Sequence, residues 1–408
     1  MGNGNDSPLK KTWVRLLKNK PAFISLIVIC IAMVLSIIGP SIAPDKTPDA
    51  DDQVLQLANM NPGFSTKMLL VQKNREEKKT SFLSKIFIGK ENPNEMIPIV
   101  SYSFDTSANI VIQAYQGIGR APLQRSIPLV DVCEALSITN QNFVIKGNQL
   151  SYKNYNEQAH VTTIDALKKE IEQNRIITKS YLLGTDNYGR DILSRLLFGV
   201  RVSLSVGLVA VLISLTIGIF MGSVAGYFRG KTDDIIMWLI NVIWSIPTIL
   251  LAMAIRFAIG DKIPSFLAIF IAVGLSMWVE VARIVRGQVL AEREMEYVQA
   301  ARGLGFNHAR IIFKHILPNI IGPIMVIAAS NFAAAILIEA GLSFVGIGIK
   351  PPTPSWGTML NDHRAYLLTP DKAFLALAPG ICIMIMVLTF NLLGNGLRDA
   401  FDVKGKTV

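Results

Sequence analysis

The chain has 408 residues, of which 51% are hydrophobic and 17% charged, and its formal net charge is +10. So large an apolar share with so few charges excludes an ordinary soluble domain and predicts a membrane protein. The basic excess lies beside apolar runs and forms no aromatic-rich basic face, which argues against a nucleic-acid partner. Cys30, Cys133 and Cys382 are widely separated, so we expect neither a disulfide framework nor a metal site.

The N-terminal segment, residues 1–20, is polar and basic. The positive-inside rule places such a segment in the cytoplasm. The apolar run that follows, residues 21–44, is too long for the hydrophobic region of a cleavable signal peptide and lacks a small-residue cleavage site. We therefore expect it to stay in the membrane as the first span.

Six apolar runs lack charged residues and are close to the ~20 residues of helix that cross a ~30 Å hydrocarbon core. They are residues 21–44, 203–228, 235–255, 263–279, 319–338 and 373–397. We therefore expect an all-α polytopic membrane protein with six transmembrane helices. Alternation from a cytoplasmic start places residues 284–318 and the tail, 401–408, inside. It places residues 45–202 and 350–372 outside.

Residues 45–183 differ in composition from the rest, because Lys, Glu, Asn and Gln are frequent and no run is long enough to span. Their β-branched and aromatic residues predict strands at 96–104 and 109–115, and the Gly147-Asn148 turn predicts a hairpin. Thr162 with Asp165 predicts the start of a helix. We expect a small α+β extracellular domain between the first and second spans.

The segment after this domain, residues 184–202, begins with a glycine-bounded turn and continues with apolar residues interrupted by basic ones. This pattern predicts an interfacial helix on the outer membrane surface. A motif with a function of its own and a plain membrane anchor both fit it. The residues that would form the motif are Gly184, Asp186, Gly189, Arg190 and Asp191.

Small residues recur every four positions along the second span, at Ala210, Ser214, Gly218, Gly222 and Gly226. They form a ridge on which another helix can pack closely. That helix belongs either to this chain or to a second subunit, and the sequence leaves both open.

Three residues within the spans are candidates to line a translocation path. Pro247 removes a backbone donor in the middle of the third span, which predicts a kink, either beside a cavity or packed for structural reasons. Glu339, at the end of the fifth span, is a polar group at membrane level, where function is the default expectation. Solvation at the interface is the alternative for Glu339. Asn331, in the same span, completes this set.

Residues 292–318 form a charged island between two apolar runs. Small side chains give its first half a face with little bulk, two glycines permit a sharp reversal, and a Leu-Pro pair begins the next span. These features predict a short helix that enters a groove on a partner, or a loop anchored to lipid headgroups. The residues concerned are Glu296, Gln299, Ala300, Ala301, Gly303, Gly305, Arg310, Leu317 and Pro318.

Nothing in the sequence indicates catalysis. The four histidines, at positions 160, 308, 315 and 363, are scattered, and no nucleophile or paired acid accompanies them. Gly230-Lys231-Thr232 is similar to the end of a phosphate-binding loop, but Ala225 stands where its first Gly is required. We expect no catalytic residue and no cofactor bound by this chain.

The charged island resembles the signature loop of ABC import permeases, which holds a Glu-Ala-Ala triplet, a Gly four residues later and a Leu-Pro pair. Ala300, Ala301, Gly305, Leu317 and Pro318 keep that spacing. Gln299 stands where the family has an acidic residue. The stretches 184–204, 226–228, 282–288, 342–346 and 396–399 resemble the C subunit of oligopeptide and dipeptide permeases. The resemblance is close over residues 181–403 and loose over residues 1–44.

The resemblance implies an ABC importer (MetI-like) permease core over residues 203–400, with residues 284–318 as its ATPase-coupling loop. It implies a bacterial plasma membrane protein with both termini cytoplasmic. The implied partners are a second homologous permease subunit, two cytoplasmic ATPases that hold ATP and Mg, and an extracellular peptide-binding protein.

The implied cargo is an oligopeptide, with a dipeptide or a metal chelate as alternatives. An ATP-independent secondary transporter is a rival hypothesis, although the sequence shows no inverted repeat of broken helices. A membrane-anchored receptor, with the outer domain as its binding part, is a third.

Overall fold

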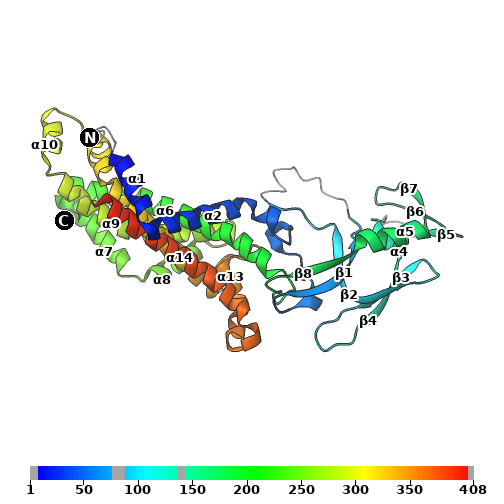
Figure 1. Cartoon of the computed structure of the whole chain (residues 1–408). Helices are drawn as coiled ribbons and strands as arrows, with labels where there is room; N and C mark the ends of the chain where they lie inside the picture. The colour runs from blue at the N-terminus through cyan, green and yellow to red at the C-terminus, as the bar shows by residue number, and fades with distance from the viewer. Residues whose placement is uncertain (1–7, 76–87, 137–142, 403–408) are drawn as a thin grey trace, which may run out of the picture. The chain divides into compact units, whose positions relative to one another are not determined.

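The structure is a computed structural model and describes residues 8–75, 88–136 and 143–402 (Figure 1). The chain divides into two compact units. The first, here called the membrane unit, consists of Met1–Ser36, Gly199–Arg364 and Ala376–Val408. The second, the insertion unit, consists of Ile37–Phe198 and Ala365–Leu375.

The long helices are α1 (Pro8–Lys18), α2 (Lys20–Ile42), α6 (Ile192–Phe228), α7 (Gly230–Trp244), α8 (Thr248–Ile259), α9 (Ser265–Glu292), α12 (Ile321–Phe344) and α14 (Phe374–Phe401). In the described part of the chain, five helical segments are long and apolar enough to cross a membrane. The α7–α8 pair makes a sixth if it is one broken span, since its halves meet at 93°. Each of the six predicted runs thus overlaps one of these five segments or the α7–α8 pair.

The prediction of a separate interfacial helix over residues 184–202 is wrong. Residues 184–191 form a turn, and a single helix, α6, then runs from Ile192 to Phe228. No proline interrupts this sequence, and the Nε of Arg201 donates to the carbonyl of Ser36 on α2 at 2.9 Å. At ~1.5 Å per residue α6 is longer than a ~30 Å membrane core requires.

The predicted end of the fourth span at residue 279 is also too early, because α9 continues to Glu292. Val281, Val285 and Val289 keep one face of the helix apolar beyond Glu280, and all three are fully buried. Spacings of four residues keep that stripe on one side, so the charges between them do not end the helix.

The small-residue ridge of α6 serves packing within this chain. A Cβ added to Gly218 would lie 2.4 Å from the Cβ of Val281, and one added to Gly222 would lie 2.5 Å from the carbonyl oxygen of Ala282. These approaches are closer than any side chain tolerates, so the glycines let α6 and α9 touch. Of the two partners that the sequence left open, the helix of the same chain is the one observed.

The insertion unit contains a five-stranded sheet in the order β4-β3-β2-β1-β8 and a three-stranded sheet in the order β5-β6-β7, all antiparallel (Figure 1). Its strands are β1 (Phe64–Gln72), β2 (Asn94–Phe104), β3 (Asn109–Ala114), β4 (Leu123–Pro128), β5 (Val144–Lys146), β6 (Gln149–Lys153), β7 (Ala159–Thr163) and β8 (Ile176–Tyr181). Its helical segments are η1 (Pro48–Ala50), η2 (Leu55–Leu57), α4 (Leu129–Cys133), α5 (Ile164–Glu170) and η3 (Ile171–Arg175).

The predicted strands and hairpin of this domain are confirmed, and Ile145 faces Leu150 across the turn. The helix start was placed one residue early, because Thr163 and not Thr162 caps α5, its hydroxyl accepting from the amide of Ala166.

The insertion begins and ends on neighbouring strands. Phe64, at the start of β1, pairs with Tyr181, at the end of β8, and the amide of Gly63 donates to the carbonyl of Tyr181 at 2.9 Å. The residues just before β1 and just after β8 are therefore close in space, although the domain separates them in the sequence.

Candidate functional site

The charged island folds into a chain of short helices between α9 and α12. They are α10 (Glu296–Gly303), α11 (His308–Ile311), η4 (Ile312–Ile316) and η5 (Leu317–Ile320). Between α10 and α11 the chain reverses at Gly305, whose φ of 77° lies in the left-handed region that glycine adopts without strain. Asn307 then caps α11, because its side-chain oxygen accepts from the amide of Arg310 at 2.8 Å.

One face of α10 belongs to the core of the membrane unit. Val298 is fully buried and Ala301 is 4% exposed, and both belong to a cluster with Val281, Val285 and Ile316. This packing fixes the orientation of α10 against α9.

The opposite face of α10 is bare. Leu304 is 73% exposed, and a Cβ added to Gly303 or to Gly305 would meet no atom within 4 Å. Glu296, Gln299 and Ala300 are also exposed. The loop therefore presents small and uncovered residues that the fold itself does not use for packing.

Tyr227, at the end of α6, holds this loop in place. Its hydroxyl lies 3.0 Å from Nδ1 of His308, and its carbonyl accepts from Nη1 of Arg293 at 2.7 Å. The guanidinium of Arg302 lies 5.1 Å from the centre of its ring. The sequence analysis missed this role of Tyr227, because only the fold brings it to the loop.

Further contacts stiffen the loop from within. The side-chain amide of Gln299 donates to the carbonyl of Glu294 at 3.0 Å, and the Tyr297 hydroxyl donates to the Glu292 carboxylate at 2.6 Å. Burial, together with that carboxylate, raises the pKa of Tyr297 to about 12. Arg310 stacks on the ring of Phe306 at 4.1 Å. These contacts hold the loop together and attach it to α6 and α9.

The charged side chains of the turn at residues 184–191 are buried, whereas the sequence predicted that they lie at the membrane surface. Asp186 and Asp191 are each 1% exposed and Arg190 is 4% exposed. Nε of Arg190 donates to Asp186 at 2.7 Å, and its Nη1 donates to Asp51 at 2.9 Å. Burial raises the pKa of Asp191, against the hydrogen bonds that it accepts from Ser194. The charged side chains of this turn therefore pair with residues of the insertion unit itself.

The glycines of this turn explain its tight packing. A Cβ on Gly184 would lie 2.2 Å from the carbonyl oxygen of Met60, and one on Gly189 would lie 1.8 Å from that of Val54. The turn therefore packs backbone to backbone on residues 54–60.

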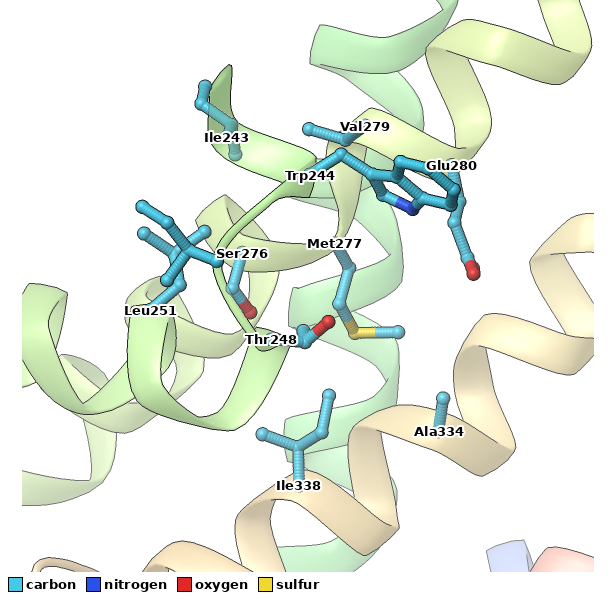
Figure 2. Close-up of a pocket in the computed structure, with 11 residues that line it drawn as sticks. Ile243, Trp244, Thr248, Leu251, Ser276, Met277, Val279, Glu280, Ala334 and Ile338 are labelled. Atoms are coloured by element: carbon cyan, nitrogen blue, oxygen red, sulfur yellow. The ribbon is translucent and has the colours of Figure 1, made fainter. Parts of the chain in front are cut away.

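The helix break at Pro247 is sharper than the expected kink, since α7 ends at Trp244 and α8 begins at Thr248. Beside it lies a cavity of about 120 Å³ (Figure 2). Residues of the break, of α9 and of α12 line this cavity: Ile243, Trp244, Ile246, Thr248, Leu251, Ser276, Met277, Val279, Glu280, Ala334 and Ile338.

The other two path candidates lie elsewhere on α12. Asn331 and Glu339 are each 1% exposed, and the hydroxyl of Ser343 donates to the Glu339 carboxylate at 2.7 Å. Glu339 is thus not solvated at an interface, and neither residue lines the cavity beside Pro247. Glu280, which the sequence analysis did not select for this role, does line it.

The fold and this site define a polytopic membrane subunit that carries a rigid, uncovered loop. Residues 214–404 match the family described as "Binding-protein-dependent transport system inner membrane component". Residues 7–62 match the "N-terminal TM domain of oligopeptide transport permease C". Residues 63–213 lie outside both matches.

Several curated proteins are similar over about the same length. The chain is 40% identical to the glutathione transport system permease protein GsiD of Pectobacterium atrosepticum, over 56% of this chain and 75% of that protein. It is 42% identical to the dipeptide transport system permease protein DppC of Alkalihalophilus pseudofirmus, over 55% and 72%. It is 39% identical to the oligopeptide transport system permease protein OppC of Bacillus subtilis, over 56% and 73%.

The chain therefore belongs to the family of binding-protein-dependent permeases, the inner-membrane transport subunits of ABC importers. A chain of the MetNI methionine ABC transporter, solved in inward-facing conformations, aligns over 51% of this chain and 96% of its own length. With a TM-score of 0.43 and 19% identity, that likeness is too distant to support an argument.

Proposed function

We propose that this chain is a permease subunit of an ATP-driven importer of peptides, and that its loop at residues 292–318 is the docking point for cytoplasmic ATPases. The observation that carries the proposal is the uncovered face of α10 and of the turn after it, where a Cβ added to Gly303 or to Gly305 would meet no atom within 4 Å. A rigid surface of small residues fits a partner that approaches its backbone closely. Oligopeptides are the favoured cargo because residues 7–62 match the permease C domain.

In this mechanism the partner ATPases hold ATP and Mg, and their closure on ATP moves the docked loop. Tyr227 and Arg293 tie the loop to α6 and α9, so a displacement of the loop turns those helices with it. A ligand shifts such an equilibrium only by its different affinities for the two states, and here ATP supplies that difference. A second, homologous permease subunit and an external peptide-binding protein complete the importer, with both termini of this chain in the cytoplasm.

Gly303→Ala is the sharpest test of docking. The added methyl group has open space, and alanine favours a helix over glycine by ~1 kcal/mol, so this chain should fold at least as well as before. If an ATPase packs on α10, the same methyl group should weaken its binding and lower peptide uptake per ATP hydrolysed. Gly287→Ala, at a second helical glycine with open space, is the matched control on α9.

The measurement is copurification of the ATPases with the permease, followed by ATP hydrolysis and peptide uptake in proteoliposomes. Gly303→Leu should enlarge the effect. Gly305→Val adds backbone strain to the bulk, because the φ of Gly305 is 77°, and it should uncouple hydrolysis from uptake while membrane insertion stays normal. Normal coupling in both the Ala and the Leu variants would contradict docking at α10. Uptake without any ATPase would instead favour the secondary transporter.

A further inference from the structure

The cavity beside the α7–α8 break has one strongly polar group on its wall. Its lining is largely apolar, apart from the hydroxyls of Thr248 and Ser276 and the carboxylate of Glu280. Figure 2 shows the Trp244 indole next to Glu280, with Ala334 and Ile338 on the separate helix α12. The break in the backbone therefore opens a small space in which a carboxylate, an aromatic ring and two hydroxyls come together.

The neighbouring cations of α9 are already engaged. Arg286 holds Asp233 of α7 through its Nε at 2.5 Å and its Nη2 at 2.6 Å. Arg283 stacks over the ring of Trp244 at 4.0 Å, and so does not form the pair with Glu280 that its spacing suggests. Within the described residues, no hydrogen bond or ion pair reaches the Glu280 carboxylate, which is exposed.

The position of Glu280 makes this exposure informative. It directly follows the apolar run 263–279, and α9 continues for about three further helical turns to Glu292. A carboxylate beside a membrane-spanning run is unfavourable in contact with lipid, so it faces water or a cationic partner. The cavity provides the place where such a partner fits.

We propose that Glu280 binds the cationic amino group of the peptide in transit, with Trp244, Thr248 and Ser276 shaping the subsite. This inference rests on the peptide import proposed above. A cavity of about 120 Å³ holds an amino group or a small side chain but not a whole peptide, so it acts as a point of contact along a path. The carboxylate supplies a charge-assisted hydrogen bond, the hydroxyl oxygens accept the remaining N–H groups, and the indole attracts a cation.

The test compares the full importer in proteoliposomes, with its binding protein and ATPases, in wild-type, Glu280→Gln, Glu280→Asp and Glu280→Lys forms. The cargo is one peptide with either a free or an acetylated amino terminus. The same binding protein serves every variant, so any change in the ratio of the two uptake rates belongs to the permease. Glu280→Gln should lower the free-to-acetylated ratio about tenfold, Glu280→Asp should retain most of it, and Glu280→Lys should lower it further.

A second measurement reads out access to the subsite. Glu280→Cys, in a chain whose three native cysteines are replaced, should react with a cationic methanethiosulfonate reagent. Excess free-amino peptide should slow that reaction during turnover, and the acetylated peptide should not.

Three outcomes overturn the inference. If Glu280→Gln keeps the wild-type ratio, the carboxylate does not recognise the amino group. If Glu280→Gln loses the second permease subunit, or if the thiol of the Glu280→Cys variant is unreactive in the assembled importer, the carboxylate instead meets a cation of that subunit. If the wild-type importer takes up neither peptide, the proposed function fails as well.

Discussion

The turn at residues 184–191 and the loop at residues 292–318 both resemble family motifs, and both contain a pair of glycines among charged residues. In the turn, a Cβ added to either glycine would lie 1.8 or 2.2 Å from a backbone carbonyl oxygen, and the charged side chains are buried. In the loop, a Cβ added to Gly303 or to Gly305 would meet no atom within 4 Å, and Glu296, Gln299 and Arg310 are exposed.

This difference distinguishes two physical reasons for the residue types of a motif: packing within the chain, and contact with a partner. The residue types of the turn are required by the chain itself, because a larger or uncharged residue there would leave a clash or an unpaired charge inside the insertion unit. On α10, Val298 and Ala301 pack in the core, but Glu296, Gln299, Ala300 and Gly303 on the exposed face are not required for packing in this chain. That exposed face is why the loop and not the turn is the candidate site for a partner.

Gly189→Ala should give the largest effect. Its Cβ would overlap the carbonyl oxygen of Val54 at 1.8 Å, and its φ of 73° is unfavourable for alanine. We expect a loss of about 3 kcal/mol or more in stability and little protein in the membrane. Thermal unfolding in detergent and the membrane yield measure it. Gly63→Ala has φ of 80° but open space, so it should cost only ~1 kcal/mol. Equal losses in both variants would refute the steric explanation.

Arg190→Met tests the buried charges of the turn. Removing the guanidinium leaves the buried Asp186 with Arg195, at 3.6 Å, as its remaining salt-bridge partner, which should cost about 3 kcal/mol in unfolding free energy. Denaturant titration of the purified chain measures the loss. The double variant Arg190→Met with Asp186→Leu should recover part of it, since the carboxylate buried beside Arg190 is removed together with the guanidinium, although Asp51 and Arg195 each lose one partner. A further loss in the double variant would show that the pair itself stabilises the fold.

Gln299→Glu tests the loop, where the comparison predicts a small effect on the fold. The residue is exposed, and its amide makes one hydrogen bond, to the carbonyl of Glu294, that a carboxylate cannot make. We expect a cost below ~1 kcal/mol and normal assembly with the ATPases if the family's acidic residue fits the same partner groove. Copurification yield decides the point. A lost complex with an unchanged melting temperature would mean that the groove has become acidic.

Asp131→Asn should have the smallest effect on stability, and that effect should depend on pH. Burial raises the pKa of Asp131, so the folded state favours the protonated form more than the unfolded state does. The contribution of the Asp131 side chain to the free energy of unfolding is therefore complete below its unfolded pKa near 3.8. It is lost as the pH rises through the higher pKa of the folded state. Asp131→Asn should be slightly more stable than wild type at about pH 7 and equal to it at about pH 3. Hydrogen exchange of β3 and β4 measures both. A gain that persists at the lower pH would assign the effect to packing.

The spans and the outer domain followed from local patterns. Uncharged runs near 20 residues located the membrane helices, and β-branched alternation with a Gly-Asn turn located β2, β3 and the β5–β6 hairpin. The errors fell where a local pattern meets a tertiary contact. The end of α9 was misplaced because helix–helix packing through Gly222 and Val285 outweighs a few charges. The start of α6 was misplaced because no proline separates the predicted interfacial helix from the predicted span. The turn motif was assigned to the membrane surface because Asp51, which pairs with Arg190, is far away in sequence.

The sequence by itself determined the membrane class, the positions of the spans and the family resemblance of the loop, since these depend on composition and short-range spacing. Only the tertiary structure decided which glycines are packed and which are bare, that Tyr227 holds the loop, and that the Glu280 carboxylate lies beside a broken helix with its neighbouring cations engaged elsewhere. Such facts depend on which residues meet although they lie tens of positions or more apart in the sequence, and a spacing pattern does not record those distances.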